Sequence, residues 1–235
     1  MVQKRRFEIF GIPTVEWGER KERVFVAVHG YMSNKEDTVI QILAETAAEK
    51  GIQVLSFDLP QHGDRKERDA LCKVENCVAD LRTVIQYAKQ KWQSIGVFAC
   101  SMGAYFSLMA YEDENLTQDL FVSPVVDMER IIRNMMRTFS ITPERLQEEQ
   151  VIEVATGQKM YWDDYCYVNE HPIRTWNVPT AILYGAEDDL CEREKTVGFC
   201  NQFHCQLEIV QQSGHYFHTP GQLSAYTTWL RKNII

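Results

Sequence analysis

Short apolar runs alternate along the chain with longer segments in which apolar residues recur every three or four positions. Such runs are typical of strands that are covered on both faces of a sheet. They occur at residues 23–28, 52–57, 95–99, 120–126 and 180–185, and a further strand is expected at 206–210. The order of strands and helices predicts an α/β protein with a mostly parallel, doubly covered sheet and right-handed crossovers.

The segments with helical spacing predict amphipathic helices between the strands. We expect helices at 39–47, 74–92, 193–203 and from Thr219-Pro220 onward. Ser33 and Glu36, three residues apart, predict a capping box ahead of the first helix, and Gly51 predicts its end.

Two segments depart from this alternation. Residues 6–17 alternate between polar and apolar positions around a Gly-Ile-Pro break, which predicts an antiparallel hairpin at the edge of the sheet. Residues 127–172 combine two short predicted helices, 129–137 and 143–151, with an aromatic cluster at 161–167. We interpret this segment as a small helical lid over the carboxyl edge of the sheet; the alternative is a crossover whose aromatic side chains pack in the core.

Length and composition place the chain among ordinary globular proteins. Its 235 residues suit one α/β domain, 1–235, with the lid as an insertion at about 127–172. The composition is 45% hydrophobic and 25% charged, and no apolar run reaches the length of a membrane span. The first ten residues lack the apolar stretch of a signal peptide, so we expect a cytoplasmic protein.

Charge and cysteine usage exclude further classes of function. The net charge of −8, with no basic stripe, disfavours nucleic acid as a partner. Seven scattered cysteines without metal-ligand spacing indicate reduced thiols rather than a disulfide framework or a zinc site. Nothing in the pattern specifies an oligomeric state.

One strand-to-helix junction carries the features of a nucleophile elbow. The strand predicted at 95–99 is followed by Ser101 and by a helix-compatible segment, 102–111. Such a turn requires a positive φ at the serine and small residues two positions before and after it. Ala99 and Gly103 meet this requirement, although glycine is usual at both positions. The neighbouring Cys100 is an alternative nucleophile.

A serine nucleophile needs a base, which in turn needs a carboxylate. In open α/β sheets the reactive groups gather beyond the carboxyl ends of the strands. His215 follows the last predicted strand in a polar turn, so we assign it as the base. His218, directly before a helix, is the alternative.

The candidate acid follows the strand predicted at 180–185. Glu187, Asp188 and Asp189 stand there side by side, and a solvated surface turn is the alternative interpretation of these three acids. We favour Asp188, at the third position after the strand, with Asp189 as the next candidate.

The oxyanion of an acyl-transfer transition state requires backbone N–H donors. Met102 follows the nucleophile at the start of a helix and supplies one predicted donor. Tyr31, in the loop after the strand at 23–28, supplies the second. His29 ends that strand and is assigned a structural hydrogen-bonding role rather than the role of the base.

Five short motifs occur in a consistent order between these elements. They are H-G-Y at 29–31, D-L-P-Q-H-G at 58–63, A-C-S-M-G at 99–103, G-A-E-D at 185–188 and S-G-H at 213–215. With the order Ser101, Asp188, His215, the sequence resembles the α/β-hydrolase superfamily over its whole length. Within it, the chain is similar to small bacterial esterases and to lysophospholipase-like or serine-aminopeptidase-like hydrolases. The resemblance implies hydrolysis through an acyl-enzyme without a metal or organic cofactor.

The resemblance also implies a role for His62 in shaping the site. Met135, Tyr161 and Trp162 in the predicted lid are the other candidate pocket residues. We expect a serine carboxyl-ester hydrolase whose partner is a small-molecule ester with a small or medium acyl group. A thioesterase, a peptidase or amidase, and a non-catalytic ligand-binding protein of the same fold are the alternatives. An aminopeptidase would require a lid carboxylate such as that of the adjacent residues 163 or 164.

Overall fold

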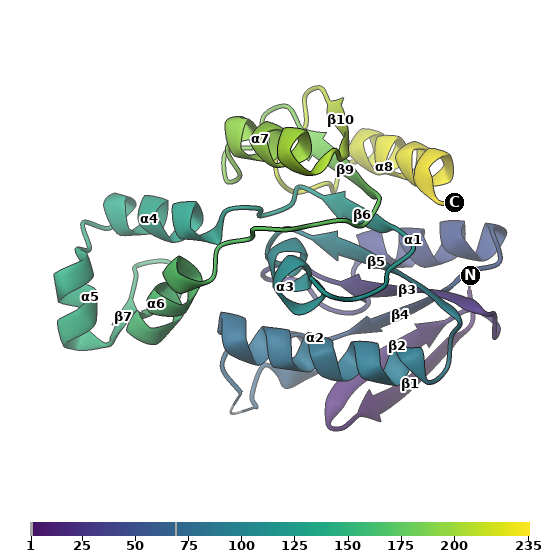
Figure 1. Cartoon of the computed structure of the whole chain (residues 1–235), viewed down its shortest axis with the longest axis horizontal. Helices are drawn as coiled ribbons and strands as arrows, with labels where there is room; N and C mark the ends of the chain where they lie inside the picture. Colours follow the sequence, from purple (N-terminus) through teal and green to yellow (C-terminus); the bar gives the residue numbers. More distant parts are fainter. Residues whose placement is uncertain (1, 69) are drawn as a thin grey trace.

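The computed structural model describes residues 2–68 and 70–235, and its centre is an eight-stranded sheet (Figure 1). The strands, in spatial order, are β1 (Lys4–Ile9), β2 (Ile12–Trp17), β4 (Gln53–Phe57), β3 (Arg23–Val28), β5 (Ser94–Cys100), β6 (Asp119–Val122), β9 (Thr180–Gly185) and β10 (Gln206–Val210). Strands β1 and β2 form the expected antiparallel hairpin at one edge, and β2 runs antiparallel to β4. The remaining pairs are parallel, which confirms the predicted sheet.

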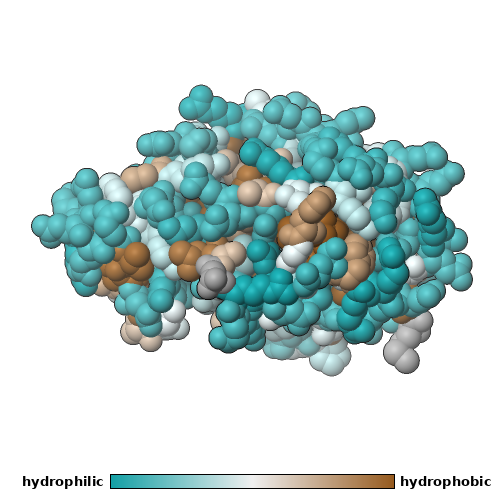
Figure 2. Space-filling model, turned by 90° about the horizontal axis from the view of Figure 1, so that it is seen from below, coloured by the Kyte–Doolittle hydropathy of each residue, from teal (hydrophilic) through white to brown (hydrophobic). Residues whose placement is uncertain are grey.

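Helices cover both faces of the sheet. Helices α1 (Thr38–Glu49) and α8 (Pro220–Asn233) pack on one face, and α2 (Val74–Lys89), α3 (Met102–Ala110) and α7 (Arg193–Phe203) pack on the other. Alternate β3 residues divide between the two apolar clusters, because successive strand side chains point to opposite faces. The outer surface seen in Figure 2 is largely hydrophilic with small separate hydrophobic areas. Across the described ranges, every helix is too short or too polar to cross a bilayer.

The start of α1 differs from the sequence prediction. Ser33 and Glu36 do not form a capping box, because α1 begins only at Thr38, with Asp37 at the N-cap position. The Ser33 hydroxyl donates to the Asp37 carboxylate, and the Glu36 carboxylate pairs with Arg6 on β1. Both side chains of the expected capping box therefore bind other partners. Glu36 binds a residue of the distant strand β1, and Ser33 binds a residue of its own loop.

Residues 127–172, called the insertion below, separate β6 from β9 and project to one side of the sheet (Figure 1). The insertion contains α4 (Met128–Thr138), α5 (Pro143–Glu149), β7 (Val151–Glu153), β8 (Lys159–Tyr161) and α6 (Trp162–Glu170). It buries an apolar cluster of its own, made by Met136, Ile141, Leu146, Ile152, Val154 and Met160. The two short helices agree with the prediction, whereas the β7–β8 hairpin was not expected.

Two adjacent acids join the insertion to the start of α2. The Val74 backbone N–H donates to Oδ1 of Asp164 over 2.8 Å, and Lys73 Nζ pairs with Oδ2 of Asp163 at 2.6 Å. The Lys73 ammonium also lies over the Tyr161 ring, 4.4 Å from its centroid. Burial raises the pKa of Asp164 to about 6. The two carboxylates therefore hold the insertion against the sheet domain.

An unusual acid lies in the core at the start of β6. Asp119 is completely buried, and neither carboxylate oxygen has a hydrogen-bond partner among residues 2–68 and 70–235. Burial raises the pKa of Asp119 well above its ordinary range. The folded chain therefore holds this side chain in its protonated, neutral form.

Asp119→Asn is expected to change the pH dependence of stability. An unfolded aspartate titrates near pH ~3.9, so the folded state binds more protons above that pH and wild-type stability falls as the pH rises toward the folded pKa. The asparagine variant lacks this loss. In urea denaturation at pH 4 to 7, its unfolding free energy relative to wild type should increase with pH, by up to about 1.4 kcal/mol for each pH unit. Parallel pH profiles would contradict the buried-acid assignment, and the exposed Asp113→Asn variant serves as control.

Candidate active site

Ser101 occupies a strained turn between β5 and α3. Its φ of 50° and ψ of −123° lie outside the regions that non-glycine residues favour, as the elbow pattern predicts. Hydrogen bonds fix the turn: the Ser101 N–H donates to the Val122 carbonyl over 3.1 Å, and the Ser101 carbonyl accepts from the Val125 N–H over 3.0 Å. The turn therefore presents the Ser101 side chain at the carboxyl edge of the sheet.

The residues beside the turn are small because strand and helix approach closely. A Cβ atom on Gly103 would lie 2.5 Å from the His29 carbonyl oxygen, which is too close for any other residue type. Ala99 is fully buried at the end of β5, so its methyl group is accommodated. The departure from the usual glycine at this position is therefore compatible with the elbow.

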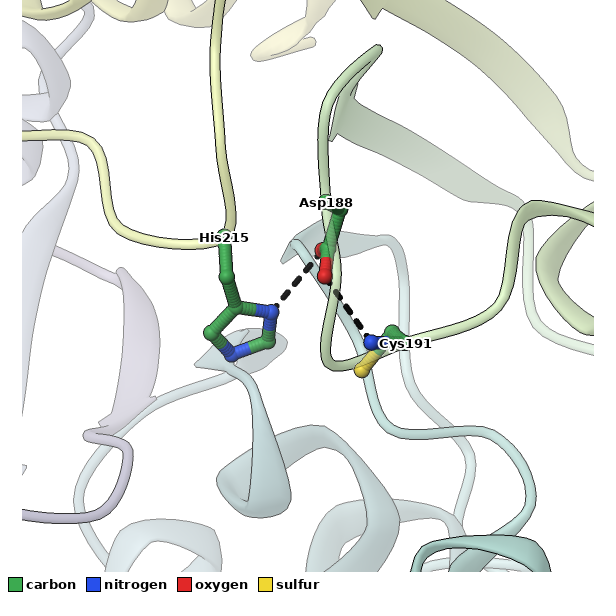
Figure 3. A group of neighbouring side chains, drawn as sticks. All are labelled: Asp188, Cys191 and His215. Carbon is green, nitrogen blue, oxygen red and sulfur yellow. Dashed lines mark hydrogen bonds and ion pairs between the residues drawn. The ribbon is translucent and has the colours of Figure 1, made fainter. Parts of the chain in front are cut away.

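A chain of hydrogen bonds joins Ser101 to two distant residues. His215 Nε2 lies 2.8 Å from Ser101 Oγ, and His215 Nδ1 lies 2.8 Å from Oδ2 of Asp188. The other carboxylate oxygen accepts from the Leu190 and Cys191 N–H groups, over 3.0 and 2.8 Å (Figure 3). The Asp188 side chain is fully buried, and only 17% of the His215 side chain is exposed. Because Asp188 accepts from Nδ1, Nε2 is free to accept the serine proton.

The alternatives weighed from the sequence lie elsewhere. Asp189 and Glu187 are exposed, and the hydrogen bond to His215 comes from the neighbouring Asp188. His218 is exposed, and its Nδ1 lies 2.9 Å from the Tyr216 carbonyl oxygen. Burial raises the pKa of the Cys100 thiol, which keeps that sulfur protonated and weakly nucleophilic.

The loop after β3 lies against the serine. A Cβ atom on Gly30 would be 3.1 Å from Ser101 Cβ. Beside it, the buried His29 accepts from the Leu59 N–H at Nε2 over 3.1 Å and donates from Nδ1 to the Gly30 carbonyl over 2.7 Å. Burial lowers the pKa of His29 to about 4, so this ring is neutral. His29 therefore has the structural hydrogen-bonding arrangement expected from the sequence.

The same contact orients the next amide. In a trans peptide the C=O and N–H groups point in opposite directions, so a Gly30 carbonyl directed at His29 turns the Tyr31 N–H away from it. This N–H donates to no other group in the described ranges of the chain. Met102 is the first residue of α3, where backbone N–H groups lack partners within the helix. Of the two predicted donors, Tyr31 therefore follows Gly30, which lies against Ser101, and Met102 follows Ser101 itself.

The candidate pocket residues are divided between two places. His62 is buried beside the loop after β3, with its ring centroid 5.6 Å from that of Tyr31. Met135 and Trp162 pack against the apolar cluster of the insertion, and Tyr161 lies beneath the Lys73 ammonium. His62 thus lies next to the loop that contacts Ser101, whereas the three insertion residues have their contacts within the insertion and at α2.

Sequence reasoning missed a hollow between the loop after β6 and the start of α7. Its lining combines the apolar residues Pro124, Val125, Val126, Ile131, Leu190 and Cys191 with the polar or charged residues Asp127, Arg130, Glu192, Lys195 and Thr196. Two of these residues touch the site directly, because Val125 binds the Ser101 carbonyl and Cys191 binds Asp188. The Asp188 carboxylate accepts from the backbone N–H groups that follow it, which is a turn that aspartate commonly forms. This aspartate was the sequence signal available for the loop on one side of the hollow.

Asp188, Cys191 and His215 also form a group that could hold a metal ion, since one ligand atom of each lies within 4.8 Å of the others. His215 is already hydrogen-bonded to Asp188 through Nδ1 and to Ser101 through Nε2. Burial raises the pKa of the Cys191 thiol, which opposes the thiolate form that metals bind. These residues therefore fit the hydrogen-bonded arrangement better than a metal site.

This sheet, its helices and the turn at Ser101 define the α/β-hydrolase fold, and solved structures share it. Est1E from Butyrivibrio proteoclasticus is 19% identical, with a TM-score of 0.78 over 97% of this chain and 96% of that chain. The mouse alpha/beta hydrolase domain-containing protein 10 is 13% identical, with a TM-score of 0.75 over 99% and 97%. An esterase from Pyrococcus furiosus is 17% identical, with a TM-score of 0.69 over 99% and 91%.

The sequence gives a more specific assignment. A family model described as serine aminopeptidase, S33 (Hydrolase_4), matches residues 19–171. The chain therefore belongs to this family and is a hydrolase of the α/β-hydrolase superfamily. The matched range includes Ser101 and ends before Asp188 and His215. No curated protein sequence matches the chain.

Proposed function

We propose that the chain hydrolyses carboxylic esters of small or medium acyl groups through an acyl-enzyme formed on Ser101. The observation that carries this proposal is the hydrogen-bond chain from Ser101 through His215 to Asp188, with both links at 2.8 Å. A serine hydroxyl becomes a nucleophile at neutral pH when such a base is in contact with it.

In the proposed reaction, His215 Nε2 removes the Ser101 proton as Oγ attacks the ester carbonyl. The Asp188 carboxylate holds the Nδ1 proton and stabilises the imidazolium that forms. The imidazolium then gives its proton to the leaving alcohol. A water molecule repeats the attack on the acyl-enzyme, with His215 again as the base.

The oxyanion would be stabilised by the backbone N–H groups of Tyr31 and Met102. The contact between Gly30 and Ser101, and the His29 bond that orients the Gly30–Tyr31 peptide, support the first donor. The position of Met102 at the positive end of α3 supports the second. Loss of one such donor typically costs about 10²- to 10³-fold in kcat.

The hollow beside Val125 and Cys191 is the proposed place of the acyl group, because its walls are joined to the turn at Ser101 and to Asp188. Its volume of about 10 Å³ holds about one water molecule, so the side chains around it must move to admit a hydrocarbon group. The insertion supplies part of this lining through Ile131, which supports its role as a lid.

The family description also names aminopeptidases, so peptide hydrolysis is the competing function. An aminopeptidase would need a free lid carboxylate for the substrate ammonium group. Asp163 is paired with Lys73, and Asp164 accepts from the Val74 N–H, so both acids are committed to the contact with α2. This arrangement favours the ester over the aminoacyl substrate.

A substrate panel tests this choice. We expect kcat/KM for p-nitrophenyl butyrate to exceed that for alanyl p-nitroanilide by at least about 10- to 150-fold, since a missing charged hydrogen bond alone costs about 1.5–3 kcal/mol. A butyryl thioester included in the panel separates an esterase from a thioesterase. A preference for the aminoacyl anilide or for the thioester would contradict the proposal.

A further inference from the structure

Two cysteines face each other at the start of α2, outside the hydrogen-bond chain of Ser101, His215 and Asp188. Cys72 Sγ lies 3.8 Å from Cys77 Sγ. Cys72 comes directly before the N-cap residue Lys73 and is partly exposed, whereas Cys77 is buried in the helix. Of the two residues, Cys72 is therefore the more accessible to a small reagent, and its sulfur is next to that of Cys77.

The two sulfurs differ in protonation. The hydrogen bond with Cys77 lowers the pKa of Cys72 to about 6, and contacts with His62 and Arg65 act in the same direction. Burial raises the pKa of Cys77. The pair thus consists of a nucleophilic thiolate that accepts a hydrogen bond from a resolving thiol.

We propose that Cys72 and Cys77 form a thiol switch that a hydroperoxide closes to a disulfide. The Cys72 thiolate attacks the outer oxygen of the hydroperoxide, so an S–O bond forms, the O–O bond breaks, and the alkoxide leaves and takes up a proton. Cys77 sulfur then attacks the sulfenic acid: the S–S bond forms, the S–O bond breaks, and hydroxide leaves as water with the Cys77 proton. Two thiols are oxidised, and one hydroperoxide is reduced to an alcohol and water.

Formation of the Cys72–Cys77 disulfide would weaken the contacts that hold the insertion. The sulfurs must approach from 3.8 Å to about 2.05 Å, which moves the two side chains and strains the turn between them. That turn contains Lys73 and Val74, whose contacts with Asp163 and Asp164 hold α6. In the reduced protein these contacts hold the insertion at α2. Formation of the disulfide should weaken them and loosen the insertion.

Peptide mapping tests the chemistry, because trypsin cleaves between the two cysteines after Lys73. The intact protein is treated with equimolar hydrogen peroxide, alkylated and digested without reductant. We expect peptides 69–73 and 74–82 to appear as one disulfide-linked species, two hydrogens lighter than the separate peptides, that dithiothreitol separates. Cys77→Ser should instead leave a Cys72 sulfenic acid that dimedone traps, and Cys166→Ser should behave as wild type.

Free Cys72 and Cys77 after treatment, or equal oxidation of all seven cysteines, would overturn the proposal. Hydrogen–deuterium exchange tests the coupling to the insertion. We expect deuterium uptake in α6 to rise in the oxidised protein and not in oxidised Cys72→Ser. A linked pair with unchanged exchange in α6 would refute the coupling.

Discussion

Ser101→Ala is expected to lower kcat for a p-nitrophenyl ester by about 10⁴- to 10⁶-fold, the range seen when the nucleophile of a serine triad is removed. The substitution deletes one oxygen, whose hydrogen bond is with His215. The turn itself is held by backbone bonds to Val122 and Val125, so the fold should remain. Steady-state kinetics and a urea unfolding curve of the variant check both statements.

The matched control is Cys100→Ala, which changes the neighbouring side chain by a similar amount. Its thiol is protonated, because burial raises the pKa of Cys100, and it does not join the hydrogen-bond chain. We expect this variant to lose less turnover than the about 10²-fold that a 1 Å misplacement of reacting groups can cause. If Ser101→Ala remained active while Cys100→Ala did not, the nucleophile assignment would be wrong.

Asp188→Asn is expected to lower kcat by about 10⁴-fold, as for the corresponding change in a serine protease triad. The asparagine keeps the shape of the side chain but loses the charge that stabilises the imidazolium. Its amide can also donate to Nδ1, which would leave the His215 proton on Nε2, facing Ser101. Pre-steady-state kinetics should show slow acylation with little change in KM.

Asp189→Asn is the control, since it makes the same chemical change one residue away on an exposed side chain. It should keep near wild-type turnover, because its carboxylate does not contact His215. A larger loss in Asp189→Asn than in Asp188→Asn would show that the acid has been assigned to the wrong residue.

The main features of the fold follow from local sequence signals. The buried strands β3, β5 and β9 are continuous apolar runs, so their sequence specifies burial on both faces without reference to other segments. The turn at Ser101 is also local, because its positive φ and the space at Gly103 depend on a few adjacent residues. Asp188 was favoured over its acidic neighbours because it stands at the third position after the end of β9, where this architecture tends to place its acid.

Features that depend on distant partners were not predictable in the same way. Glu36 and Ser33, the expected capping pair before α1, bind Arg6 and Asp37 instead. No residue near Ser33 in the sequence indicates this. The strands β7 and β8 are three residues long, below the length at which alternation is informative. The sequence marks Met135 as a candidate pocket residue, but it does not specify the apolar cluster of the insertion against which this side chain packs.

The central claim is that the Ser101 hydroxyl is a reactive nucleophile. Labelling with a fluorophosphonate tests this claim most directly. The probe bonds to a serine only when an adjacent base activates the oxygen. We predict a single adduct on the tryptic peptide that contains Ser101 in the wild-type protein, and none in His215→Ala. An unlabelled wild-type protein, or an adduct at another residue, would contradict the claim that Ser101, His215 and Asp188 act as one catalytic unit.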